Sequence, residues 1–256
     1  MEIDGKIVVV TGAANGIGLA LAQAFARHDA AHVICADLDA EGAAKAAKPL
    51  NGSSYGIDVA DPAQLSAMID DIEAQIGPID IFCSNAGILR AGGIETSDDD
   101  WQKMWEVNVL SHVWAARALV PRMAKRGGGY FLNTASAAGL LNQIGSLSYG
   151  VTKHAAVGLA EWIALSHGDQ GIKVSVLCPQ AVRTQMTQGH EDHVAALDGM
   201  LEPAPVAEAC IEAIKTETFL VLPHPEVLGY MRAKTDDYDR WIAGMQKLNR
   251  RFTALP

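Results

Sequence analysis

Tyr149 and Lys153 stand four residues apart in this 256-residue chain. On a helix this spacing puts both side chains on one face, roughly 6 Å apart at their Cβ atoms, so the ammonium can act on the phenol. A free tyrosine titrates near ~10, so acid–base catalysis at neutral pH requires about 4 kcal/mol of selective stabilisation of the phenolate. One ammonium ~4 Å away at an effective dielectric of ~20 supplies about that much before desolvation. The pair suits a tyrosine acid/base, although an ordinary half-exposed helix pair has the same spacing.

A glycine-rich segment follows the first apolar run of the chain. It lies where a strand at 7–10 would turn into a helix at 17–28. Glycines there permit a tight turn, let a diphosphate approach the helix N-terminus, and allow helix and strand to pack closely. Glycine is common in such turns, so the trio alone is weak support for a cofactor loop. The residues of this segment expected to bind the cofactor are Gly12, Asn15, Gly16, Ile17 and Gly18.

Asp37 ends the second apolar run and is followed by Leu38. A carboxylate at the end of this strand is typical of proteins that bind the adenosine ribose of NAD. The same carboxylate would repel a 2′-phosphate, and neither Leu38 nor the glycine segment offers a cation to bind one. The sequence therefore predicts NAD rather than NADP. The alternative interpretation of Asp37 is a strand-end acid that only begins a turn.

Composition excludes several classes of function. Thirty acidic residues against twenty basic ones give a net charge of −10, which argues against nucleic acid and anionic membrane surfaces as partners. No apolar run approaches the ~20 residues of a membrane span, and the N-terminus lacks the character of a signal peptide, so a cytoplasmic protein is expected. The four cysteines are scattered through apolar stretches and are expected to be buried thiols.

Short β-branched runs alternate with longer alanine-rich segments of helical period. The runs predict strands at 7–10, 32–36, 54–57, 79–84, 130–134, 173–178 and 219–222. The longer segments predict helices at 17–28, 39–47, 62–76, 98–125, 147–168 and 204–216. This alternation implies an α/β fold: a single doubly wound Rossmann-type domain over 1–256, whose seven-stranded, mainly parallel sheet has helices on both faces.

Six motifs, in the correct order, resemble those of the short-chain dehydrogenase/reductase family in its compact single-domain branch. The resemblance covers most of residues 5–225. The matches are the glycine loop from Thr11 to Gly18, Asp58 with Val59, Asn85 with Ala86 and Gly87, Asn108, Ser136, and the pair Tyr149 and Lys153.

This resemblance implies a role for each matched residue. Ser136 would hold the substrate oxygen beside Tyr149, which would move the proton. Lys153 would lower the pKa of Tyr149 and hold the nicotinamide ribose, while Asn108 would anchor a water that connects the lysine to solvent. Further positions expected to contact NAD are Asp58, Val59, Asn85, Ala86, Gly87, Pro179, Val182 and Thr184.

Three positions leave alternatives open. Asp58 could simply cap the following helix, and Asn108 could simply kink or cap its own helix. Gln180 stands where the family usually has glycine. It either restricts the loop or projects an amide into the substrate pocket.

Two segments are expected to enclose the substrate. Stretch 185–202 is polar and suits a mobile flap, and its run 190–193 is expected to be a solvated loop rather than a metal site. The helical extension at 226–256 has an apolar stripe that either braces the domain or closes the substrate side. The stripe comprises Tyr238, Trp241, Met245, Leu248 and Phe252, and the pocket candidates are Leu89, Leu140, Leu141, Gln180 and Met186. His154, beside the lysine, is interpreted as packing.

Together these observations predict an NAD-dependent oxidoreductase that interconverts a secondary alcohol and a ketone by hydride transfer, without a metal. A mostly apolar substrate of moderate size and the direction of alcohol oxidation are expected. The resemblance also implies a homo-oligomer, a tetramer or dimer, formed through the helices near 98–125 and 147–168. A dedicated ketone reductase and a cofactor-sensing regulatory protein are the alternatives, and the intact Ser136, Tyr149 and Lys153 argue against the latter.

Overall fold

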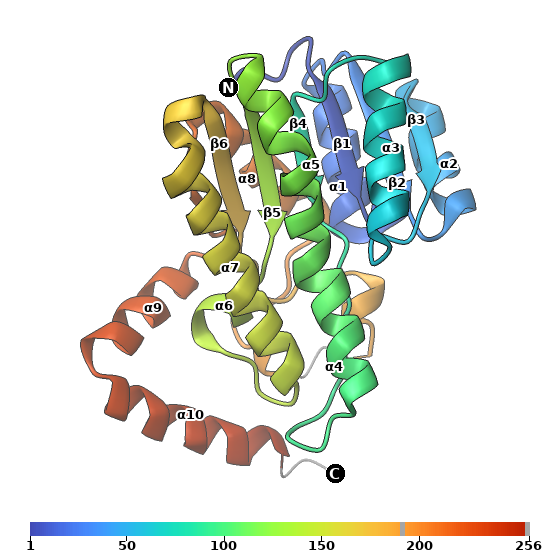
Figure 1. Ribbon diagram of the computed structural model, residues 1–256. Coiled ribbons are helices and arrows are strands. Elements are labelled where there is room, and N and C mark those ends of the chain that lie inside the picture. Colours follow the sequence, from blue (N-terminus) through green and yellow to red (C-terminus); the bar gives the residue numbers. More distant parts are fainter. Residues whose placement is uncertain (190–192, 254–256) are drawn as a thin grey trace.

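The computed structural model describes residues 1–189 and 193–253 and contains one parallel sheet of seven strands (Figure 1). Across the sheet the order is β3-β2-β1-β4-β5-β6-β7. The chain therefore reverses its direction of growth between β1 and β4, where doubly wound sheets open a crevice at the carboxyl ends of their strands. The strands are β1 Ile7–Thr11, β2 His32–Asp37, β3 Ser53–Gly56, β4 Ile81–Ser84, β5 Gly129–Thr134, β6 Ile172–Leu177 and β7 Leu220–Val221.

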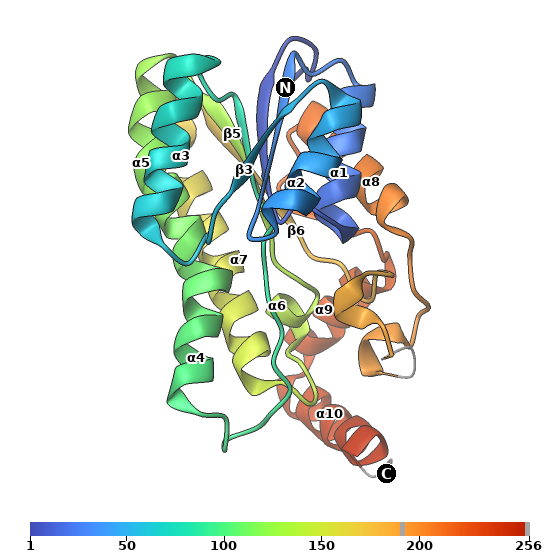
Figure 2. The same ribbon diagram turned by 90° about the vertical axis from the view of Figure 1, so that its right-hand side faces the viewer.

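Helices cover both faces of this sheet, as Figure 2 shows. One face carries α1 Gly16–Arg27, α2 Ala40–Ala47 and α8 Pro203–Thr216. The other face carries α3 Pro62–Gln75, α5 Ser111–Lys125 and α7 Leu147–His167. The predicted doubly wound α/β fold is confirmed, and all strand pairs are parallel.

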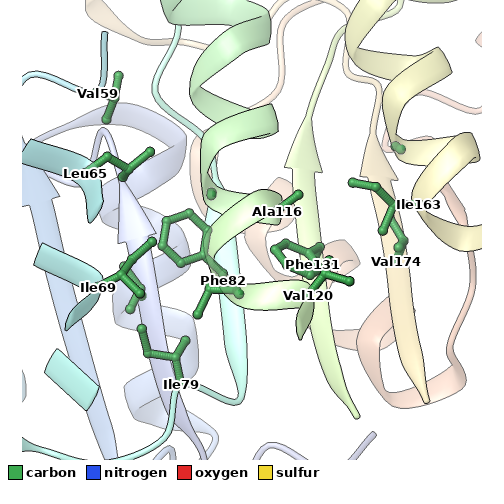
Figure 3. Close-up of a cluster of buried hydrophobic side chains, with 14 of the residues drawn as sticks. Val59, Leu65, Ile69, Ile79, Phe82, Ala116, Val120, Phe131, Ile163 and Val174 are labelled. Atoms are coloured by element: carbon green, nitrogen blue, oxygen red, sulfur yellow. The ribbon is translucent and has the colours of Figure 1, made fainter. Parts of the chain in front are cut away.

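The core forms because side chains alternate across the central strands. Phe82 and Phe131 point toward α3, α5 and α7 (Figure 3), whereas Cys83 and Leu132 belong to the cluster under α1 and α8. Every residue of β4 and β5 is buried, as expected for strands covered on both sides. This packing fixes the strand ends from which the site residues project.

The helix predicted at 98–125 is continuous but not regular. It comprises α4 Asp98–Trp105, a π-helical turn Glu106–Leu110, and α5. Ser97 caps α4 by accepting a hydrogen bond from the Asp100 N–H at 3.2 Å. The π-helical turn contains Asn108, and such turns are frequent at functional sites.

Beyond the sheet, the chain forms smaller elements around the strand ends. A short helix α6, Ala138–Leu141, follows β5, and the predicted extension consists of two helices, α9 Glu226–Asp236 and α10 Tyr238–Thr253. The segment 185–202 contains only the 3₁₀ turns Gln185–Thr187 and Val194–Ala196 among its described residues. Within residues 1–189 and 193–253, no helix combines the length and apolar character that a membrane span requires.

Candidate active site

The glycine loop between β1 and α1 is tightly packed. Gly12 and Gly16 have φ values of +66° and +56°, a backbone region that favours glycine. A Cβ on Gly12 would lie 2.9 Å from the Ala86 Cα, and one on Gly18 would overlap the Gly12 carbonyl oxygen. Glycine at these positions thus lets the loop, the start of α1 and the segment after β4 pack closely together.

Hydrogen bonds join the ends of three neighbouring strands behind this loop. The Thr11 Oγ1 accepts from the N–H groups of Asn85 (3.0 Å) and Ala86 (3.1 Å). The Asn85 Nδ2 donates to the Thr11 carbonyl at 3.0 Å, and its Oδ1 accepts from the Thr134 hydroxyl at 3.1 Å. The carboxyl ends of β1, β4 and β5 are therefore held in a fixed arrangement.

Asp37 braces the glycine loop from the end of β2. Its Oδ2 accepts from the Ala14 N–H at 2.9 Å and its Oδ1 from the Asp39 N–H at 3.0 Å. The neighbouring Leu38 side chain is 74% exposed and lines the same cavity. The carboxylate thus has a structural task in addition to any contact with a ligand.

Asp58 does not cap the helix that follows it. Asp61 caps α3, because its Oδ1 accepts from Ala63 and Gln64 N–H groups. Asp58 instead accepts from the Ala60 N–H at 2.9 Å and forms an ion pair with Lys103 at 3.1 Å. Lys103 lines the cavity from α4. The sequence did not identify it as a site residue, because no motif links it to the end of β3.

Ser136, Tyr149 and Lys153 meet at the carboxyl end of β5, and all three are buried. The Ser136 hydroxyl accepts from the Ala138 N–H at 3.1 Å and donates to the Pro179 carbonyl at 3.4 Å. The Lys153 Nζ donates to the carbonyl of Thr134 at 2.9 Å and lies 5.6 Å from the centroid of the Tyr149 ring. The spacing that suggested a functional pair therefore brings phenol and ammonium together.

Burial dominates the titration of this pair. It raises the pKa of Tyr149, while the Ser136 side chain hydrogen-bonded to the phenol acts in the opposite direction. Burial also lowers the pKa of Lys153 to about 8. The expected lowering of the Tyr149 pKa by Lys153 is not seen, because the ammonium faces the ring and the Thr134 carbonyl while the phenol is desolvated.

Asn108 is fully buried in the π-helical turn. Its side chain exchanges two hydrogen bonds with the backbone of Ile88, both at 2.9 Å, and donates to the Thr152 hydroxyl at 3.2 Å. A Cβ on Gly87 would lie 3.3 Å from the Asn108 Oδ1 and 3.4 Å from the Lys153 Nζ. Asn108 therefore does more than kink its helix, since it links α7 to the segment after β4.

The loop after β6 closes over the glycine loop. The Val182 carbonyl accepts from the Thr187 hydroxyl at 2.6 Å, and Val182 forms a single parallel bridge with Leu201. A Cβ on Gly16 would lie 3.0 Å from the Thr184 methyl group. The two loops thus form opposite walls of one space.

Gln180 lines the cavity, and hydrogen bonds hold both its backbone and its side chain. Its backbone N–H donates to the Nδ1 of His224 at 3.2 Å, which restrains the loop. Its side-chain Nε2 lies on the cavity wall and donates to the Asp198 carboxylate at 2.9 Å, and the Tyr230 hydroxyl donates to the same carboxylate at 3.0 Å. Asp198, His224 and Tyr230 come from distant segments, and no sequence motif pointed to them.

These elements surround a cavity of about 1010 Å³. Every residue predicted to contact the cofactor or to act in catalysis lines it except Asn108, which lies behind it. Leu89, Leu141, Gln180 and Met186 also line it. Leu140 does not, because it packs against the cluster around Val227. From the extension, the stripe residues Trp241, Met245 and Leu248 reach the cavity, whereas Tyr238 and Phe252 do not.

Two further sequence interpretations concern histidines: the run 190–193 and His154. Residues 190–192 of the run considered as a metal site lie outside the described part of the chain, and His193 has its ring 6.5 Å from that of Phe252. Among the residues that the structure describes, no three His, Cys, Asp or Glu side chains gather as metal ligands would. His154 is exposed rather than packed, and its Nδ1 lies 2.7 Å from the Gly150 carbonyl of the same helix.

Comparisons with known proteins agree with this geometry. A family model described as short chain dehydrogenase matches residues 6–195. The meso-2,3-butanediol dehydrogenase of Serratia marcescens is 35% identical over 81% of this chain and 86% of its own. The 1-deoxy-11-beta-hydroxypentalenate dehydrogenase of Streptomyces exfoliatus is 33% identical over 95% and 92%. A short chain dehydrogenase/reductase from Burkholderia phymatum, solved in complex with NAD, is 28% identical with a TM-score of 0.84, covering 93% of this chain and 96% of that one.

Proposed function

This chain belongs to the short-chain dehydrogenase family, and on that premise we propose that it is an NAD-dependent oxidoreductase that interconverts a secondary alcohol and a ketone. One observation carries the proposal. Ser136, Tyr149 and Lys153 open into the same cavity as the glycine loop and Asp37. A substrate oxygen and a dinucleotide can therefore be held side by side.

The residues present fit a nicotinamide dinucleotide. The open N-terminus of α1 suits a diphosphate, and the half-buried Asp37 suits the hydroxyls of a ribose. When bound, the nicotinamide would supply the hydride acceptor or donor. The residues that would hold it are those of the glycine loop, Asp37, Leu38, Asp58, Val59, Asn85, Ala86, Gly87, Pro179, Val182 and Thr184.

Ser136 and Tyr149 would handle the proton. The Ser136 hydroxyl would hold the substrate oxygen, and the phenolic oxygen of Tyr149 would take the proton of the alcohol during oxidation or return it to the ketone during reduction. Because burial raises its pKa, the free phenol is protonated at neutral pH, so oxidation requires stabilisation of the phenolate. The nearby Lys153 ammonium supplies positive charge for that step, and Asn108 holds the backbone beside it.

The proposal is tested by following reduced cofactor across a panel of secondary alcohols, and oxidised cofactor across the matching ketones. Tyr149→Phe should lower kcat by about 10²–10⁴-fold, the usual contribution of an acid/base, while NAD still binds. Tyr130→Phe is the control, because Tyr130 is also buried but its hydroxyl bonds Ser175, away from the cavity. Tight NAD binding without turnover of any substrate would favour a regulatory protein instead.

A further inference from the structure

α10 lies along the catalytic cavity and contacts other parts of the chain near both of its ends. Near its start, Trp241 packs against the cluster of Leu141, Val227 and Met231. Lys234, at the end of α9, donates to the Leu140 carbonyl at 2.7 Å. Near its far end, the Phe252 ring lies 6.5 Å from that of His193. Figure 1 shows the helix running apart from the sheet and its covering helices.

The middle of α10 leaves space for a ligand. Trp241, Gly244, Met245 and Leu248 recur at spacings of three and four, so they share one helix face, and all line the catalytic cavity. A Cβ placed on Gly244 would meet no atom within 4 Å. Glycine costs a helix interior about fivefold in stability relative to alanine, so the sequence lacks a helix-favouring side chain where one would enter the cavity.

A second cavity of about 740 Å³ adjoins the first. Leu141, Trp241 and Met245 line both, and Ile242 lines the second. The space along α10 therefore continues past Trp241 into the second cavity. The wall that α6 and α10 contribute to both cavities consists of the apolar side chains Leu141, Trp241 and Met245. The segment between α6 and α7 adds Asn142, Gln143, Gly145 and Ser146 to the shared lining.

We propose that the substrate carries an extended apolar portion, such as a long alkyl chain or a fused ring system, that lies under α10, with Gly244 setting the room available to it. This inference rests on the proposed function, because it places the reacting hydroxyl at Ser136 and Tyr149. The occupant is the substrate itself, since the apolar face is continuous with the catalytic cavity. Each methylene buried there should contribute up to about fourfold in kcat/KM.

The experiment compares linear secondary alcohols from 2-butanol to 2-decanol with wild type, Gly244→Leu and Gly229→Leu. Gly229 is the matched control, because it is an exposed glycine of α9 whose Cβ would also meet nothing within 4 Å, yet it lines neither cavity. Leucine favours helix at both positions, so both variants should fold. In wild type, kcat/KM should rise with chain length. Gly244→Leu should lower the ratio of kcat/KM for 2-decanol to that for 2-butanol at least tenfold, and Gly229→Leu should keep the wild-type ratio.

Each other outcome overturns the inference in a distinguishable way. A flat or falling chain-length series in an active enzyme removes the extended substrate and leaves the proposed function intact. Absence of turnover with every alcohol, long or short, removes the proposed function as well. If Gly244→Leu changes the molecular mass in solution while the chain-length ratio stays at the wild-type value, a second copy of the chain covers this face instead.

Discussion

Asp37 connects cofactor choice to the shape of the glycine loop. Its carboxylate holds the Ala14 N–H at 2.9 Å, which keeps a negative charge at the cavity wall where a 2′-phosphate would lie. Three cations line the cavity, Lys103, Lys153 and Arg240. The Lys103 ammonium is paired with Asp58, and the Lys153 ammonium is bonded to the Thr134 carbonyl at the catalytic end. We therefore expect a preference for NAD.

A pair of serine substitutions tests this preference. Asp37→Ser should lower the ratio of kcat/KM for NAD to that for NADP at least tenfold, since it removes the repulsion. Asp39→Ser is the matched control: that carboxylate caps α2 by accepting from the Gly42 N–H and does not line the cavity. Equal use of both cofactors by wild type would contradict the assignment.

The buried His112 makes the stability of the fold depend on pH, although it lies away from the reacting atoms. It is 1% exposed on α5, and neither ring nitrogen has a hydrogen-bond partner in the described part of the chain. Burial, with a smaller effect from the Lys153 charge, lowers its pKa to about 3. Below about pH 6.5 the unfolded chain therefore takes up a proton that the folded chain does not, so stability falls as the pH decreases toward the folded pKa.

This predicts a measurable difference in urea unfolding. Between about pH 6.5 and about pH 5, wild type should lose roughly 2 kcal/mol more of its free energy of unfolding than His112→Leu. Carboxylates contribute equally to both proteins and cancel in the comparison. His154→Leu, at an exposed histidine, should keep the wild-type slope. Parallel slopes for wild type and His112→Leu would show that the imidazole is already charged when folded.

At the scale of elements, the caps and periodicities predicted six helical segments, from 17–28 to 204–216, to within one or two residues, but not the short α6 or the division of the extension into α9 and α10. They could not reveal the π-helical turn at Glu106–Leu110, because its extra residue depends on the fit of Asn108 between Ile88 and Thr152. Nor could they show that Asp198 and Tyr230 meet at Gln180, since contacts between distant segments leave no local pattern. The residues of the glycine loop and the pair Tyr149 and Lys153 could be predicted, because each motif consists of residues that lie close together along the chain.

The Asp198 contacts fasten the flap to α9 and to the loop after β6. Tyr230→Phe removes one donor to an exposed carboxylate, worth about 1 kcal/mol, so we expect KM for the alcohol to rise about fivefold with little change in KM for NAD. Tyr55→Phe is the control, because its hydroxyl donates to Asp71 at 2.6 Å outside the cavity. If the KM for NAD rose as much as that for the alcohol, the contact would not be specific to the substrate side.

At the scale of the whole molecule, α7 exposes large apolar side chains. Val151, Trp162 and Leu165 are 40%, 58% and 85% exposed on one face of α7, and Gly158 between them leaves the backbone accessible. Large apolar side chains that are exposed on one helix face mark a candidate interaction site. We propose that it packs against the same helix of a second copy, which agrees with the homo-oligomer expected from the sequence.

Charge placed in that face should separate the subunits. In a two-fold interface each residue is buried twice, and a buried leucine contributes about 1.5–3 kcal/mol, so Leu165→Lys should raise the dissociation constant at least about a hundredfold. Light scattering after size exclusion would then show a lower mass than for wild type. Ile94→Lys is the matched control, because Ile94 is 92% exposed but lies in the loop before α4 rather than on α7, and it should leave the mass unchanged. A monomeric wild type, or equal masses for wild type and Leu165→Lys, would mean that this face of α7 does not join two copies, and the assembly would then have to use another surface.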